Sequence, residues 1–176
     1  MHVLSRQRGV SLIEVLMAVL IFSIGLIGLA GLLVMATRSN QAGYLRTQVT
    51  FLASNMADRM RSNPVGLWNG NYNSTAYPTT AKQSCDINVA CTAQQVAVRD
   101  QYLWSSMLTT SLPEATASIQ CSDKSAAGFT PSADQIGMRP PYGGNCEMKI
   151  SWSERRAGDK EQRDAKPQTF VWAFQP

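Results

Sequence analysis

Histidine is nearly absent from this chain of 176 residues, since His2 is the only one. A Ser–His or Cys–His nucleophile needs an imidazole beside the attacking group. The chain beyond His2 has none, so that part of the chain cannot build such a nucleophile. There is no phosphate-binding loop either. Four acidic residues resemble paired carboxylates, but basic residues alternate with them, as in a solvated loop. They are Glu154, Asp159, Glu161 and Asp164. We therefore expect no enzymatic activity and no cofactor.

Charged residues are also scarce. They make up 16% of the chain, and the net charge is +4, whereas a typical globular domain has ~25% charged residues. Together with the 44% of hydrophobic residues, this excludes a disordered polyelectrolyte. The length suits one modest domain and is too short for two full enzyme domains.

The longest gap in charge runs from Glu14 to Arg38, with no charged residue between them. Residues 15–36 are largely apolar, and as a helix they would be long enough to cross a ~30 Å hydrocarbon layer. Arg6 and Arg8 precede this run, so the positive-inside rule places the N-terminus in the cytoplasm and the rest of the chain outside.

An ordinary secretory signal peptide is the simplest alternative, and Val34-Met35-Ala36 offers a small-x-small cleavage site. Two features oppose it. The apolar run exceeds the usual 7–15 residues of a signal peptide. Glu14 also heads the run, and inserting a lone carboxylate into lipid costs a few kcal/mol.

The segment from Arg8 to Glu14 (Arg-Gly-Val-Ser-Leu-Ile-Glu) resembles the processing motif of type IV prepilins and pseudopilins. The resemblance implies that a prepilin peptidase of the inner membrane cuts after Gly9 and methylates the new N-terminus, Val10. Glu14 would then be the fifth residue of the mature chain, which is the family's register. One departure is Val10, where the family most often has Phe.

Glu14 has a physical role in this scheme. A carboxylate in lipid needs a cation, and cleavage creates one at the α-amine of Val10, which can belong to a neighbouring subunit. The pair would hold subunits in axial register during assembly. We therefore predict that Glu14 serves subunit assembly.

Three glycines, Gly25, Gly28 and Gly31, recur in the apolar run. Small residues allow close packing of membrane helices. Each Gly also weakens a helix by about 1 kcal/mol relative to Ala, and pilins often loosen their helix here on assembly. We favour packing.

The helix is expected to continue beyond the membrane as an amphipathic half. Apolar residues recur there at helical spacing: Leu45, Val49, Leu52, Met56 and Met60. Asp58 and Arg61 can pair three residues apart. Pro64 predicts an end near Ser62, which gives a helix of ~50 residues, or roughly 75–80 Å.

Residues 57–64 resemble a segment of the PilV class of minor pilins, which often have Asp-Arg-Met-Arg-x-Asn here. The chain then divides into a leader (1–9), the transmembrane and assembly half of the helix (10–37), and a periplasmic pilin-like domain (38–176).

The remaining chain predicts an α+β domain of pilin-like fold, with the long helix packed on a small antiparallel sheet. Residues 65–92 have loop composition. A helix is expected over 93–110, with Thr92 as its N-cap and Val96, Leu103 and Met107 on its buried side. Alternating patterns predict strands at 116–121, 146–153 and 169–174, with a charged loop over 155–167.

The four cysteines follow the membrane segment: Cys85, Cys91, Cys121 and Cys146. An even number in an oxidising compartment suggests two disulfides, with three possible connectivities. We favour Cys85–Cys91, which closes a small loop, and Cys121–Cys146, which ties two strands. Without C-x-x-C and without histidine beyond His2, no metal site is expected.

Nucleic-acid binding has little support. Loss of Arg6 and Arg8 with the leader leaves 14 of the 16 basic residues against 12 acidic ones, a net charge of +2. Trp68, Tyr72 and Tyr77 offer a stacking or adhesive surface or cover the edge of the core, and we favour the core.

These features together predict a structural minor pilin, incorporated in a type IV pilus or priming its assembly. The alternatives are a type II secretion pseudopilin and an adhesive or DNA-uptake minor pilin. A rival of a different class is a periplasmic enzyme or adhesin on an uncleaved anchor. Expected partners are the prepilin peptidase, the major pilin, other minor pilins and the inner-membrane assembly machinery. The expected location is the bacterial inner membrane, with the domain in the periplasm, and then the pilus.

Overall fold

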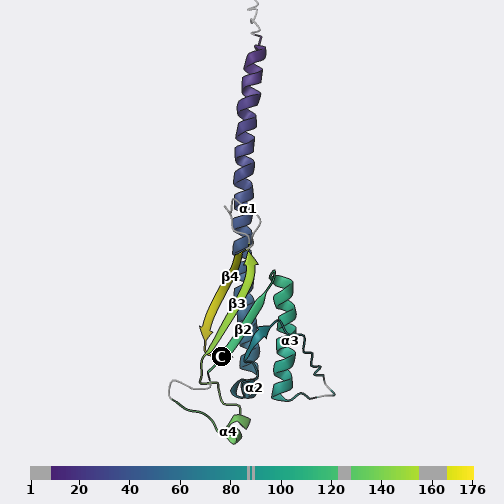
Figure 1. The fold of residues 1–176 in the computed structure, drawn as a ribbon, viewed down its shortest axis with the longest axis vertical. Helices are drawn as coiled ribbons and strands as arrows, with labels where there is room; N and C mark the ends of the chain where they lie inside the picture. Colours follow the sequence, from purple (N-terminus) through teal and green to yellow (C-terminus); the bar gives the residue numbers. More distant parts are fainter. Residues whose placement is uncertain (1–8, 87, 89, 123–127, 155–165) are drawn as a thin grey trace, which may run out of the picture.

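The structure is a computed structural model that describes residues 9–86, 88, 90–122, 128–154 and 166–176. The predicted leader, apart from Gly9, and most of the predicted charged loop therefore lie outside the described residues. The described chain has an α+β architecture, as predicted: a long N-terminal helix packs with a four-stranded antiparallel sheet. Figure 1 shows the sheet and the second long helix gathered around one half of the first, whose other half projects alone.

Helix α1 (Leu12–Ser62) is one uninterrupted helix of 51 residues, which corresponds to about 75 Å. All five residues of the predicted apolar seam, from Leu45 to Met60, are buried. The predicted pair of Arg61 with Asp58 forms at 2.9 Å. At the end predicted from Pro64, the Asn63 N–H donates to the carbonyl of Met60.

Helix α3 (Ala93–Ser111) begins with a capping box, because the Thr92 hydroxyl accepts from the Gln95 N–H and the Gln95 side chain accepts from the Thr92 N–H. The predicted buried side was right in part. Met107 packs against the core and Val96 is half-buried, but Leu103 is exposed. Trp104 is fully buried instead, and its indole donates to the carbonyl of Leu52 at 2.8 Å. The large indole with its partner on α1, rather than the smaller leucine, sets which face of α3 is buried.

The sheet has the strand order β1-β2-β3-β4, and all neighbours are antiparallel. The strands are β1 (Ser74–Tyr77), β2 (Thr116–Cys121), β3 (Cys146–Glu154) and β4 (Lys166–Phe174). The last three match the predicted strands. β4 begins three residues earlier than predicted and includes Pro167, which an edge strand tolerates because one side needs no N–H donor.

The prediction of loop throughout residues 65–92 was wrong. This stretch contains β1 and most of helix α2 (Pro64–Trp68). Asn63 caps α2 by accepting from the Gly66 N–H, with proline at the first helical position, a favourable arrangement for a helix start. A short helix, α4 (Ala133–Gly137), was also not foreseen.

The three aromatic residues of this region belong to the core. Trp68, Tyr72 and Tyr77 are 8%, 0% and 3% exposed. Burial raises the pKa of both tyrosines well above its ordinary value. The favoured assignment of these side chains to the core is therefore confirmed.

A polar network inside the domain joins the end of α1 to α3. The Tyr72 hydroxyl donates to Asp100 at 2.8 Å, and Arg59 pairs with the same carboxylate at 3.2 Å. Asn63 donates to the Tyr72 oxygen at 3.1 Å and to the carbonyl of Ala93 at 2.8 Å. These bonds satisfy polar groups that would be costly to bury alone.

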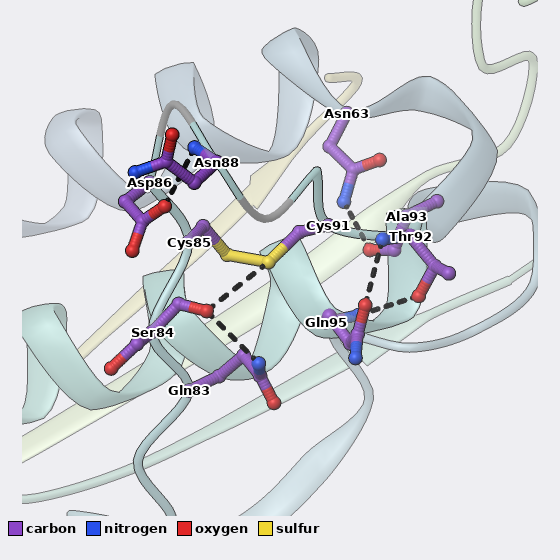
Figure 2. Close-up of a disulfide and its surroundings, with 10 residues drawn as sticks. All are labelled: Asn63, Gln83, Ser84, Cys85, Asp86, Asn88, Cys91, Thr92, Ala93 and Gln95. Atoms are coloured by element: carbon purple, nitrogen blue, oxygen red, sulfur yellow. Dashed lines mark hydrogen bonds between the residues drawn. A yellow bond between two sulfur atoms is a disulfide. The ribbon is translucent and has the colours of Figure 1, made fainter.

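Two disulfides close the domain, with the pairings favoured from the sequence. Cys85–Cys91 joins Cα atoms 5.6 Å apart, and Cys121–Cys146 joins the end of β2 to the start of β3. Figure 2 shows the first bridge directly before Thr92, near the bond from Asn63 to Ala93. The loop that precedes α3 is thus tied at the point where α3 begins.

We expect Asp100→Ala to lower the free energy of unfolding of the detergent-solubilised full chain by about 2–3 kcal/mol, since it leaves Arg59 and Tyr72 without their carboxylate. The matched control is Asp58→Ala, whose exposed pair with Arg61 is worth at most about 1 kcal/mol. Urea denaturation measures both, and equal losses would contradict a stabilising role for the buried network.

The projecting half of α1 as the candidate functional site

The half of α1 that projects from the domain exposes its apolar side chains. Leu12, Ile27 and Leu33 are 78%, 73% and 69% exposed, and the first buried residue of α1 is Leu45. None of the most apolar 18-residue stretch of the helix is buried. Such a surface is costly in water, and by length and composition the helix can cross a membrane.

Two hydroxyl groups of this half bond within the helix. The Ser23 hydroxyl donates to the carbonyl of Val19 at 2.7 Å, and the Thr37 hydroxyl donates to the carbonyl of Val34 at 2.9 Å. A hydroxyl that bonds to its own backbone leaves no unsatisfied donor in an apolar phase. These residues are therefore compatible with lipid or with a packed helix bundle.

Glu14 is different, because it carries the only charge between Arg8 and Arg38. It lies in the first turn of α1, where its N–H donates to the carbonyl of Ser11 at 3.0 Å. The helix dipole favours a carboxylate at this end by roughly 0.3–1 kcal/mol. In the described part of the chain, no basic side chain lies within ion-pair distance of Glu14. Within the described residues, the charge of Glu14 is therefore not neutralised by an ion pair.

The Gly9–Val10 bond lies ahead of the helix and is open to solvent. Val10 is 70% exposed, and a Cβ added at Gly9 would meet nothing within 4 Å. The fold itself therefore does not require glycine at position 9. An accessible bond outside regular structure is what a peptidase needs.

Gly25, Gly28 and Gly31 lie within the continuous helix, and a Cβ at each would also meet nothing within 4 Å. The chain's own packing does not demand small residues there. Close approach of another helix would demand them, so the structure is compatible with the packing role favoured from the sequence.

The candidate residues lie in separate parts of the molecule. Gly9, Val10 and Glu14 are together at the N-terminal tip of α1, whereas the two disulfides belong to the folded domain. Among the described residues, no group of three His, Cys, Asp or Glu side chains could hold a metal ion. The N-terminal tip thus offers one exposed peptide bond and one carboxylate without an ion pair among the described residues.

Sequence reasoning missed Asn63 and Asp100 of the internal network. Asn63 carried a usable signal, because asparagine followed by proline is a typical start of a helix. Asp100 carried none, since its partners Tyr72 and Arg59 are 28 and 41 residues away along the chain.

Comparison with known proteins supports the N-terminal motif. The family model described as the prokaryotic N-terminal methylation motif matches residues 4–30, which include Gly9, Val10, Glu14 and most of the apolar run. No curated protein and no solved structure matches the chain. The motif is that of type IV pilin-like proteins and pseudopilins, which are structural subunits.

We expect the double substitution Ile24→Arg and Ile27→Arg to release the protein from membranes into an alkaline carbonate wash. Two arginines at the middle of a spanning helix cost about 5–7 kcal/mol. The control is Tyr44→Arg with Phe51→Arg, two exposed positions in the half of α1 that belongs to the domain. Retention of the first variant in the carbonate-resistant pellet would contradict a membrane-spanning segment.

Proposed function

We propose that the protein is a minor pilin, similar to the PilV class, that is incorporated in a type IV pilus or primes its assembly. Its role is structural. The observation that carries the proposal is the exposed apolar half of α1, which directly follows the cleavage motif and is joined to a disulfide-bonded domain.

In the proposed order of events, membrane insertion comes first, then cleavage, then assembly. The projecting half of α1 anchors the precursor in the inner membrane, with the domain in the periplasm. Prepilin peptidase cuts between Gly9 and Val10 and methylates Val10. The inner-membrane machinery then transfers the subunit into the filament, where Glu14 pairs with the Val10 amine of a neighbouring subunit and the apolar helix packs among the helices of other pilins.

A type II secretion pseudopilin is the second candidate, because the matched motif occurs in both classes. The pilus is favoured by the resemblance of residues 57–64 to PilV-class pilins and by the disulfides of the domain. An adhesive or DNA-uptake role has less support. Trp68, Tyr72 and Tyr77 are buried, so these side chains do not form an adhesive surface.

The first test is processing. We expect mass spectrometry of the wild-type protein to find a methylated Val10 at the N-terminus, and the Gly9→Leu variant to keep its leader and to be absent from filaments. A Cβ at position 9 meets nothing within 4 Å, so a processing defect in Gly9→Leu would point to the peptidase rather than to the fold. Gly43→Leu, at another open position of α1, serves as the control. If Gly9→Leu and the wild-type protein have the same apparent mass, cleavage does not depend on Gly9. That result would favour the uncleaved anchor and overturn the proposal.

The second test concerns Glu14. We expect Glu14→Gln, which removes the charge at nearly constant volume, to leave insertion and cleavage intact and to reduce the protein in sheared filaments at least tenfold. The physical reason is the lost pair with the Val10 amine. Ser23→Ala in the same helix is the control. Sheared filaments that retain wild-type levels would contradict the assembly role, and the same fractionation in a deletion strain tells a pilus from a secretion pseudopilus.

A further inference from the structure

Strand β4 forms one edge of the sheet and pairs only with β3. The β3–β4 register runs without interruption from Lys166 to Phe174. In the part of the chain that the structure describes, no strand lies on the other side of β4. Alternate residues of β4 therefore direct their backbone N–H and C=O groups away from the sheet. Figure 1 shows β4 (yellow) at the edge farthest from α3.

This edge lacks the usual devices that prevent pairing. Residues 167–176 contain no charged side chain, and Val171 is 52% exposed. Natural edge strands are typically short, bulged or marked by lysine or proline. β4 has nine residues, and its lysine and proline both lie at its start, at Lys166 and Pro167. Most of the strand is thus a regular, uncharged template for another strand.

A cavity of about 340 Å³ lies beside this edge, between β4 and α1. Its walls include Arg46 and Val49 of α1, Trp152 of β3 and Phe170 of β4. Phe170 and Trp172 pack on the core but remain only partly buried. A strand added to β4 would cover them and place its own inward side chains in this cavity.

The charge of the cavity specifies one feature of its occupant. Arg46 is the only charged residue among those that line it, and among the described residues Arg46 has no ion pair. A carboxylate on the occupant would complement this guanidinium. Arg46 directly follows Leu45, the first buried residue of α1, so the cavity lies where the projecting half of α1 leaves the domain.

We propose that β4 is the docking site for an extended segment of a different subunit of the same assembly, which adds antiparallel to β4. The segment has alternating apolar residues and an Asp or Glu that faces Arg46. The inference rests on the proposed function for the kind of partner. A second copy of this chain fits less well. Membrane-anchored copies stand parallel, so their β4 strands would not be antiparallel, and the other edge, β1, has only four residues.

Photo-crosslinking in living cells tests the docking site on the full-length protein. A benzophenone amino acid is placed singly at Thr169, Val171 or Ala173, whose side chains are exposed on β4. The control is Gln120, which lies on β2 in the same cross-strand row as Ala173, through Glu147. An added strand neighbours β4 and is separated from β2 by both β3 and β4.

We expect the three β4 positions to crosslink to one segment of a different subunit, at least ten times more than Gln120. Mass spectrometry locates the crosslinked residue of the partner. Because the added strand is antiparallel, moving the probe two residues toward the C-terminus of β4 should move the crosslinked residue two residues toward the N-terminus of the partner. In chains with the probe at Ala173, Val171→Lys and Arg46→Glu should each reduce the crosslink at least tenfold. Gln120→Lys should not reduce it. Intact disulfides in each variant show that the domain is folded.

Four results would overturn the docking site: equal crosslinking from Gln120, adducts with lipid alone, adducts with a second copy, or partner residues without the two-residue step. Cleavage after Gly9 is read in the same samples. Normal cleavage without the stepped adducts removes the docking site and leaves the proposed function standing. Stepped adducts on a chain that is not cleaved after Gly9 would remove the proposed function and leave the docking site standing.

Discussion

Helix α1 is one continuous helix although its surroundings change along its length. Among the described residues, nothing buries its first half, whereas its second half lies at the centre of a packed core. The seam from Leu45 to Met60 is buried by the sheet and α3. The residues before it expose apolar side chains that only lipid or other helices can cover. A break in α1 would separate the anchor from the domain, so the continuous backbone couples membrane insertion to the position of the domain.

The end of α1 is fixed by polar rather than apolar contacts. Arg59 and Asn63 reach Asp100, Tyr72 and Ala93, so the last turn of α1 is bound to the start of α3. The Cys85–Cys91 bridge restrains the loop just before the same point. Because these bonds are directional, they set how α3 lies against α1 more narrowly than the apolar seam alone would.

Prediction from the sequence succeeded wherever a feature is periodic and local. The apolar run, the seam of α1, the Thr92 cap and the alternating pattern of β3 are visible in windows of fewer than 25 residues, and the structure has all of them. Prediction failed where composition competed with packing. The segment with β1 has the Asn, Ser and Thr content of a loop, yet Ser74–Tyr77 pairs with β2. The pairing with β2 stabilises this segment as a strand although its composition does not favour one.

By itself, the sequence determined the N-terminal part of the protein: the cleavage motif, Glu14 as the single charge between Arg8 and Arg38, and a helix of spanning length. These are properties of contiguous residues and need no partner elsewhere in the chain. The tertiary structure alone decided that Trp68, Tyr72 and Tyr77 face inward, that Asp100 is paired, and that no strand of the described residues pairs with the outer side of β4. Each of these depends on residues far apart in the chain meeting in space, and local periodicity carries no information about which distant segments meet.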